Sequence, residues 1–201
     1  MEPFKHFKGK VAPLDRVNID TDQIIPKQFL KLVERTGFGQ YLFYDWRFDR
    51  DGKPKPNFVL NDPRYKDAKI LLSRSNFGCG SSREHAVWAL SDYGFKTVIA
   101  SSYADIFYNN CFKNGLLLIT LDDGKVDHLF EEATKPEACS LEVNLEEQTI
   151  RNKDEIIQFE MDPYRKKCLL EGLDDIALTS ALEHKIRAHE QGLSRFRLVQ
   201  R

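Results

Sequence analysis

Three short apolar runs in the middle of the chain have the length and composition of buried β-strands: 69–72, 97–100 and 116–121. Residues 82–93 and 103–113 lie between these runs and are predicted to be helices that end at Gly94 and at Asn114-Gly115. Strands and helices that alternate in this way predict a parallel βαβαβ core. Ligands of such cores bind at the carboxyl ends of the strands.

The pattern changes after about residue 138. Residues 141–145 alternate apolar and polar side chains, as a half-buried strand does, and residues 156–159 are expected to pair with them. Residues 174–191 carry apolar positions typical of an amphipathic helix: Ile176, Leu178, Leu182 and Ile186. The chain shows no internal repeat, so we expect one compact α/β domain over 1–201, with added β-strands and a C-terminal helix.

An aromatic-rich segment lies ahead of this core. Its aromatic side chains are too dense for a solvent-exposed loop: Tyr41, Phe43, Tyr44, Trp46 and Phe48. They are expected to pack either on the core or on a partner protein. The sequence leaves these two possibilities open.

Composition limits the classes of function. Charged residues make up 30% of the 201 residues and the formal net charge is −1, which gives no support for nucleic-acid binding. No apolar run has the length needed to span a bilayer, so we expect no membrane association. Residues 1–10 lack the apolar segment of a signal peptide, and we expect a cytoplasmic protein.

The four cysteines are scattered and form no C-x-x-C pair. The chain therefore has no self-contained zinc or iron–sulfur motif, and we predict no metal ligands in it. We expect Cys111, Cys139 and Cys168 to be reduced, mostly buried thiols. Cys79 lies in a glycine-containing loop, where it either contacts a substrate or fills a tight turn.

That loop, residues 76–86, carries the strongest functional signal. Ser81 and Glu84 have the S-x-x-E spacing of a capping box, which predicts a helix that begins here. The free N–H groups and positive dipole end of this helix would face an anion. Arg83 adds a planar fork of donors suited to a carboxylate. Two glycines allow the tight bend and leave room for a ligand.

Other known sites fit this loop poorly. The G-x-G-x-x-G pattern fails because Arg83 replaces its third glycine, and the patterns of the P-loop and the nucleophile elbow do not occur. A Ser–His hydrolase that uses Ser81 or Ser82 with His85 is a further alternative, although in-line hydrogen bonding between Ser82 and His85 is awkward within one helical turn. The structural alternative for Arg83 is a salt bridge with Glu84 or Asp92.

Two further segments are candidates for the same site. The acidic cluster Asp20-Thr21-Asp22 is either a set of solvated turn and capping residues or part of an active site. Ser101-Ser102 follows the predicted strand at 97–100, so it should lie at the same edge of the sheet as the glycine loop. The glycine loop and Ser101-Ser102 are expected to line one crevice.

Residues 18–26, 76–86 and 99–107 together resemble the aconitase superfamily, whose G-x-G-S-S-R-E-H core stands at residues 78–85. Within it, residues 26–31 and 36–39 are similar to the bacterial family of isopropylmalate dehydratase small subunits. The resemblance implies the swivelling β/β/α domain of aconitase as a separate polypeptide. It also implies a large-subunit partner, which carries a [4Fe–4S] cluster on its own cysteines. The implied activity is the isomerisation of 2-isopropylmalate to 3-isopropylmalate, by dehydration and rehydration, in leucine biosynthesis.

The same resemblance implies roles for individual residues. Ser81 matches the serine whose deprotonated oxygen removes the substrate C–H proton, and Ser82 and Arg83 match residues that hold a substrate carboxylate. Asp22 matches an aspartate that orients groups around the cluster water. Lys31 and Arg35 are two candidates for a further carboxylate-binding arginine of the family. His85 is expected to buttress the loop.

Substrate choice is expected to lie at residues 27–33. Phe29, Leu30 and Leu32 are apolar and would accept an isopropyl group, with Lys31 beside them; alternatively, the apolar residues belong to the core. Pockets that differ by a methyl group discriminate by only about 1–3 kcal/mol. A related hydro-lyase for homoaconitate or methylmalate-type substrates therefore stays open, as does a non-catalytic diacid-binding module.

Overall fold

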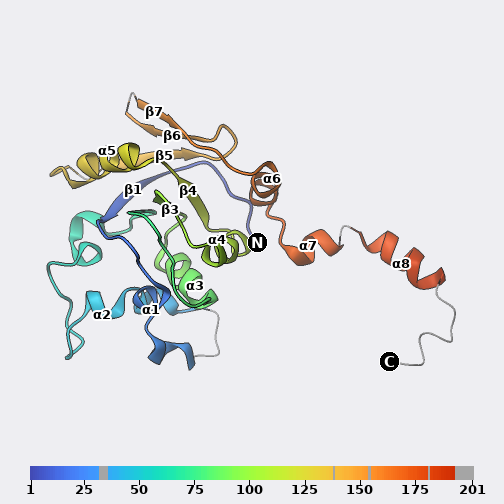
Figure 1. The fold of residues 1–201 in the computed structure, drawn as a ribbon, viewed down its shortest axis with the longest axis horizontal. Coiled ribbons are helices and arrows are strands. Elements are labelled where there is room, and N and C mark those ends of the chain that lie inside the picture. The colour runs from blue at the N-terminus through green and yellow to red at the C-terminus, as the bar shows by residue number, and fades with distance from the viewer. Residues whose placement is uncertain (32–35, 138, 154, 181, 193–201) are drawn as a thin grey trace.

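The computed structural model describes residues 1–31, 36–137, 139–153, 155–180 and 182–192, so Leu32 and Arg35 lie outside the described residues. The strands form one seven-stranded sheet in the order β4-β3-β2-β1-β5-β6-β7 (Figure 1). Four strands pair in parallel: β1 (Phe7–Leu14), β2 (Ile70–Ser73), β3 (Thr97–Ala100) and β4 (Leu117–Thr120). Three more continue the sheet in antiparallel pairing: β5 (Ser140–Asn144), β6 (Thr149–Asn152) and β7 (Glu155–Gln158).

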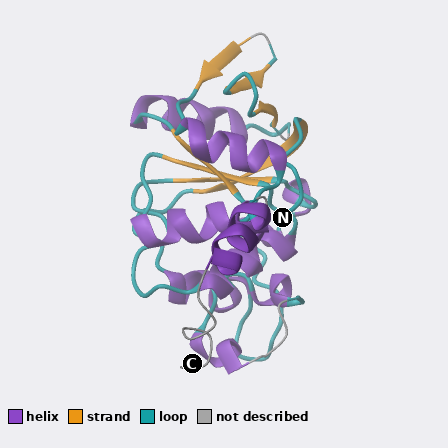
Figure 2. Ribbon diagram, turned by 90° about the vertical axis from the view of Figure 1, so that its right-hand side faces the viewer, coloured by secondary structure: helices purple, strands orange, loops and turns teal. Residues whose placement is uncertain are grey.

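Helices cover both faces of the parallel strands, which Figure 2 shows nearly edge-on. The longer helices of the main body are α3 (Glu84–Tyr93), α4 (Asp105–Lys113), α5 (Asp123–Thr134) and α6 (Pro163–Glu171). Two short ones, α1 (Thr21–Ile24) and α2 (Tyr44–Arg47), lie in the connection between β1 and β2. Short 3₁₀ turns occupy Lys27–Lys31, Phe38–Tyr41, Val59–Asn61 and Pro63–Tyr65. None of the described helices is long and apolar enough to cross a membrane.

The predicted parallel core is confirmed, and both faces of its strands are buried. In β2, Leu71 belongs to a core that also contains α3 and α4, whereas Ile70 and Leu72 belong to a second core with α5 and the antiparallel strands. Strands buried on both faces are continuous apolar runs rather than alternating ones. This is why the sequence shows them clearly.

The predicted strand at 141–145 is confirmed as β5, but its predicted pairing with 156–159 is wrong. Strand β6 lies between β5 and β7 and pairs with both. Ile150, at the centre of β6, is fully buried, and it is paired with Val143 and Ile157 in register. With only four residues and one large apolar side chain, β6 gives too short a pattern to predict.

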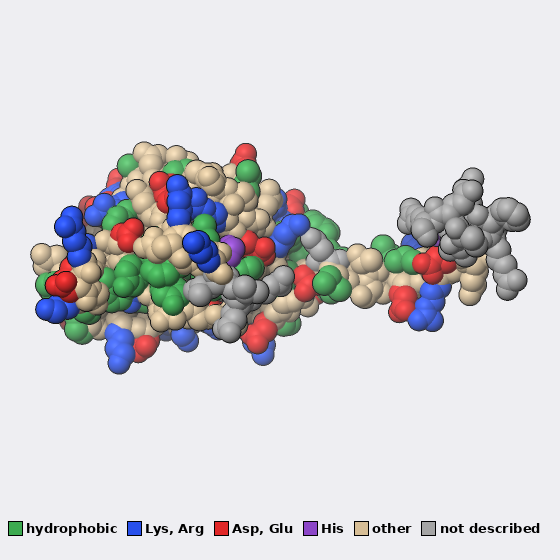
Figure 3. Space-filling view, turned by 90° about the horizontal axis from the view of Figure 1, so that it is seen from below, with side chains coloured by type: hydrophobic (Ala, Val, Ile, Leu, Met, Phe, Trp, Pro, Cys, Tyr) green, Lys and Arg blue, Asp and Glu red, His purple; other side chains and the backbone are tan. Residues whose placement is uncertain are grey.

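The single C-terminal helix predicted at 174–191 is wrong. The segment forms two helices, α7 (Asp175–Ser180) and α8 (Glu183–Gly192), which extend away from the main body (Figures 1 and 3). Ile176, Leu182 and Ile186 are 77%, 47% and 41% exposed, so the predicted apolar stripe does not pack on the sheet. Helix α6 ends at Gly172, whose φ of 69° ends the helix ahead of this arm.

The aromatic segment 41–48 packs on the chain's own core. Leu42 and Phe43 are fully buried, and the ring of Trp46 stacks on Phe43 with 5.5 Å between ring centroids. The guanidinium carbon of Arg16 lies 4.4 Å from the centroid of Trp46, on the solvent side of this stack. Of the two possibilities that the sequence left open, the inward one is confirmed.

Candidate active site

The glycine loop follows β2 and is tied to the ends of two other strands. The N–H of Gly78 donates to the carbonyl of Ile19 at 2.7 Å, which links the loop to the segment after β1. The N–H of Asn76 donates to Oγ of Ser102 at 2.8 Å, and the N–H of Phe77 donates to the Ser102 carbonyl at 3.1 Å. Ser101-Ser102 thus lies at the predicted edge of the sheet. Ser102 holds the backbone of the loop, however, and does not line the cleft described below.

Gly78 and Gly80 have φ angles of +77° and +87°, which other residues rarely adopt. A Cβ atom at Gly78 would also stand 2.1 Å from the ring of Phe107 on α4. The loop can therefore approach α4 this closely only with glycine at this position.

Helix α1 brings the acidic cluster 20–22 to the loop, where each of its three residues has a different role. Asp20 caps the helix: its carboxylate accepts from the Gln23 N–H at 2.8 Å, and Gln23 accepts from the Asp20 N–H in return. Thr21 is 2% exposed and donates its hydroxyl to the Ser81 carbonyl at 2.7 Å. Asp22 is left to face the loop.

The predicted Ser81–Glu84 capping box is wrong. The N-cap of α3 is Arg83, in an extended conformation, and no side chain caps the helix. Glu84 accepts a hydrogen bond from Nδ2 of Asn114 at 3.0 Å, so its carboxylate is turned toward α4. The Ser81 side chain is exposed and does not satisfy the helix start.

A cleft of about 260 Å³ lies where the loop meets the starts of α3 and α4. It is lined by Thr21, Gly78, Gly80, Ser81, Ser82, Arg83, Ala104, Asp105, Ile106 and Phe107. Helix α4, like α3, has no side-chain cap at its start. Two uncapped helix starts at one cleft favour an anionic ligand, because their N–H groups and dipoles are positive there. Asp105 contributes one exposed acidic side chain to the rim.

The loop backbone adds further donors. Among the described residues, none accepts a hydrogen bond from the N–H groups of Gly80, Ser81, Ser82 or Arg83. The Ser82 hydroxyl accepts weakly from Nδ2 of Asn110 at 3.4 Å. Both serines are exposed, so a ligand in the cleft can reach their hydroxyls and these amides.

Arg83 and Asp22, 61 positions apart in sequence, form an ion pair at the cleft. This replaces the alternative of a salt bridge with Glu84 or Asp92. The Arg83 side chain is 12% exposed, and Nζ of Lys27 lies 3.6 Å from the other Asp22 oxygen. The hydrogen bond from Arg83 lowers the pKa of Asp22, so this carboxylate stays ionised and holds the guanidinium in place.

The structure does not bring the predicted specificity residues into this cleft. Phe29 stacks on Tyr41 with 4.0 Å between ring centroids, and Leu30 packs beside the same core; Lys31 is exposed. None of the three lines the cleft. Sequence reasoning assigned no role to Lys27, which is the cation that joins the Asp22–Arg83 pair.

His85 and Cys79 both have structural surroundings. The His85 ring lies between the rings of Phe38 and Trp88, with centroids at 5.3 and 4.7 Å, so it buttresses the turn at 38–41 rather than the loop. Cys79 forms a β-bridge with Asp20, and burial raises the pKa of its thiol. This favours the turn-filling interpretation of Cys79.

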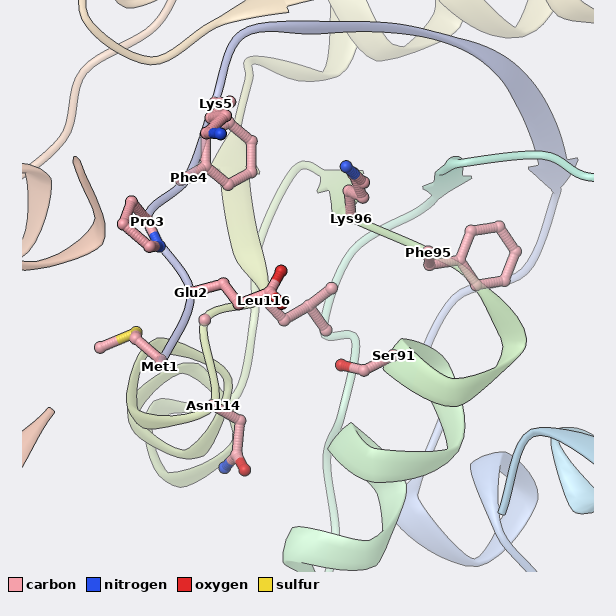
Figure 4. A pocket seen from close by; sticks show the side chains of 11 residues that line it. Met1, Glu2, Pro3, Phe4, Lys5, Ser91, Phe95, Lys96, Asn114 and Leu116 are labelled. Atoms are coloured by element: carbon pink, nitrogen blue, oxygen red, sulfur yellow. The ribbon is translucent and has the colours of Figure 1, made fainter. Parts of the chain in front are cut away.

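A larger cavity of about 740 Å³ lies elsewhere. It is enclosed by residues 1–5, the end of α3 and the turn between α4 and β4 (Figure 4). Its lining residues Lys96 and Leu116 come just before β3 and β4, so this cavity lies at the amino ends of the strands. The candidate site, at about 260 Å³, is therefore smaller than this second cavity.

Comparison with known proteins identifies the family. Residues 1–124 match the model of the aconitase C-terminal domain, and residues 127–163 match a model described as LeuD_N. The 3-isopropylmalate dehydratase small subunit of Brevibacillus brevis is 59% identical over 191 residues, which cover 94% of this chain and 98% of that protein. The chain belongs to the family of 3-isopropylmalate dehydratase small subunits.

Other members of this small-subunit family match at similar levels. The small subunit of Aromatoleum aromaticum is 55% identical over 201 residues, covering 95% of this chain and 94% of that protein. A crystal structure of 3-isopropylmalate dehydratase from Methanocaldococcus jannaschii has a TM-score of 0.66 at 25% identity, over 93% of this chain and 99% of that one. These matches confirm the predicted family and its aconitase-type α/β fold.

This small-subunit family member offers no cluster ligands in the ranges that the structure describes. No group of three or more His, Cys, Asp or Glu side chains there could hold a metal ion. Cys111 and Cys168 are buried, Cys79 and Cys139 are half-buried, and all four are free thiols. The donor set of this chain therefore does not fit an iron–sulfur cluster.

Proposed function

We propose that this chain is the small subunit of a hydro-lyase that isomerises 2-isopropylmalate to 3-isopropylmalate in leucine biosynthesis. One observation carries the proposal. The ionised Asp22–Arg83 pair stands beside the exposed Ser81 hydroxyl, at a cleft with two uncapped helix starts. A dicarboxylate with an abstractable C–H proton is the kind of substrate that this set of groups fits.

Ser81 acts as the base in this proposal. A serine alkoxide is unstable at neutral pH unless hydrogen-bond donors and positive charge surround it. The free N–H groups at 80–83, the start of α3 and the Arg83 guanidinium supply both. The loss of one such preorganised donor costs about 3 kcal/mol in the barrier.

Arg83 and Ser82 hold a substrate carboxylate. Asp22 occupies one edge of the guanidinium through Nη1, which orients the remaining N–H groups. An arginine fixed in this way binds a carboxylate in one geometry and loses little side-chain entropy on binding. Asp22 thus orients the substrate through Arg83 as well as facing the reaction centre.

The large subunit is the proposed partner, because this chain supplies only one wall of the site. We propose, as the family resemblance implies, that this subunit carries the [4Fe–4S] cluster, which would polarise the substrate hydroxyl. We propose that Ser81, Ser82, Arg83 and Asp22 face it across the bound diacid. Substrate choice among isopropylmalate, homoaconitate and methylmalate types then depends on both subunits, since Phe29 and Leu30 pack on the core.

The test is an assay of the reconstituted pair. The purified chain is mixed with the large subunit of the same organism, loaded with its cluster, and the absorbance of the alkene diacid is followed with 2-isopropylmalate. Turnover should need both subunits and should be faster than with homoaconitate or methylmalate-type substrates. Turnover by this chain alone, or binding of the diacid without turnover in the pair, would contradict the proposal.

A further inference from the structure

Thr21 stands between Asp20 and Asp22, and none of the roles above uses its side chain chemically. It is 2% exposed, and its hydroxyl donates to the Ser81 carbonyl at 2.7 Å. Its N–H donates to the Cys79 carbonyl at 2.9 Å. Thr21 therefore fastens α1 to the loop at two points on either side of Gly80.

The hydrogen bond from the Thr21 hydroxyl orients the whole peptide unit between Ser81 and Ser82. In a trans peptide the carbonyl and the next N–H point in opposite directions, so a fixed Ser81 carbonyl also fixes the direction of the Ser82 N–H. That N–H donates to no other described residue, and Ser82 lines the cleft. Gly80, just before Ser81, gives the loop unusual conformational freedom. The backbone alone therefore leaves the orientation of this peptide open.

We infer that Thr21 is a positioning residue for Ser81: its hydroxyl sets the peptide between Ser81 and Ser82, and thereby a donor for the Ser81 oxyanion. This inference rests on the proposed function, in which Ser81 is the base. Without the hydroxyl, the peptide can turn and the donor is lost from the oxyanion. Ser81 then loses stabilisation of its reactive, deprotonated form.

A second buried threonine provides a matched control. Thr97 is fully buried, and its hydroxyl donates to the Leu117 carbonyl at 2.8 Å, at the amino end of β3. Replacement of either threonine by valine removes one buried hydroxyl–carbonyl bond of nearly equal length. Only Thr21 touches the loop, so the comparison separates positioning from general stability.

The experiment uses the reconstituted two-subunit enzyme with Thr21→Val, Thr21→Ser and Thr97→Val. Thr21→Val should lower kcat by about 10- to 100-fold, as expected for a misplaced catalytic group, with a smaller change in KM. The acidic limb of its pH–rate profile, where the rate falls as the base is protonated, should move to higher pH, because the oxyanion of Ser81 is less stabilised. Thr21→Ser should restore both, and a crystal structure of Thr21→Val should show the Ser81 carbonyl turned.

Thr97→Val should lower the Tm to a similar extent and leave kcat and the pH limb unchanged. The inference is overturned if Thr21→Val behaves like Thr97→Val, or if Thr21→Ser is as impaired as the valine variant. If Thr21→Val does not fold, Thr21→Ala replaces it, and failure of both to fold would overturn the inference in favour of a purely structural bond. An inactive wild-type pair would instead contradict the proposed function.

Discussion

The two ends of the parallel strands carry cavities of different size, and the smaller cavity has the free hydrogen-bond donors. The cavity at the amino ends is about 740 Å³, and the cleft at the carboxyl ends is about 260 Å³. At the amino ends the Asn114 amide is fully engaged: it donates to Glu84 and to the Asn110 carbonyl, and accepts from Trp88. At the carboxyl ends two helix starts lack caps, and loop amides are free.

This contrast shows that volume is a poor guide to the site in this fold. A ligand at the carboxyl ends gains hydrogen bonds that the protein has left unmade. A ligand that used the Asn114 amide in the larger cavity would have to compete with bonds that already exist. Preorganised, unsatisfied donors around a fixed charge are what a substrate anion needs.

The largest expected effect comes from replacing one serine at each end of the strands. Ser81→Ala should lower kcat by about 10³- to 10⁴-fold, because it removes the proposed base, while assembly with the large subunit stays intact. Ser91, which lines the amino-end cavity, provides the control, and Ser91→Ala should retain normal kcat. A Ser81→Ala enzyme with near-normal rates would remove Ser81 as the base.

The next effect concerns stability and uses two glycines with the same φ of +77°, Gly78 at the cleft and Gly115 at the amino ends. A Cβ at Gly78 would clash with the Phe107 ring at 2.1 Å, whereas one at Gly115 meets the Met1 sulfur at 3.4 Å. Both alanine variants lose about 1–2 kcal/mol from the left-handed backbone. Gly78→Ala should lose about 2 kcal/mol more from overpacking, measured by urea unfolding. Equal losses would show that the loop yields to Phe107.

Exchange of basic residues tests the charge at each end. Arg83→Lys keeps the charge but loses the planar fork, so kcat/KM should fall by about 30- to 100-fold, or about 2–3 kcal/mol. The reverse exchange at the amino-end cavity, Lys96→Arg, should leave kcat/KM unchanged. If Arg83→Lys stayed within twofold of the wild type, a point charge would be sufficient at the cleft.

The smallest effect is a pH dependence of stability. Arg83 lowers the pKa of Asp22 below its ordinary value of 3.8, so the pair stabilises the fold above that value and loses this contribution as pH falls through the folded pKa. Because Asp22 is 39% exposed, solvent screens the pair and its contribution is at most about 1 kcal/mol. Asp22→Asn should therefore be less stable than wild type at pH 7, with a difference that shrinks toward pH 3. A constant difference in denaturant titrations at both pH values would contradict this.

The sequence predicted the parallel strands and the loop, because both depend on local composition. The sequence-based prediction failed where residues distant in the chain form hydrogen bonds with the residues of a local motif. The S-x-x-E pattern at Ser81 predicted a capping box, but Thr21 holds the Ser81 carbonyl and Asn114 draws Glu84 away. The real capping box, Asp20 with Gln23, has the same spacing and was present in the sequence as a signal.

The Asp22–Arg83 pair could not have been predicted from spacing, since α1 and α3 meet only through the sheet topology. The resemblance to a known family singled out both residues but not their contact. The C-terminal prediction failed for a different reason. An apolar stripe indicates that a helix can bury one face, but it does not say what that face packs against.

The alternation within β2 has a consequence for insertions and deletions. Ile70 and Leu72 enter one core and Leu71 enters the other, and the loop begins only a few residues later. Deletion of one residue from this strand would exchange the two faces and withdraw the loop by about 3.3 Å. The number of residues between β2 and Ser81 therefore sets how far the serine lies beyond the end of the sheet.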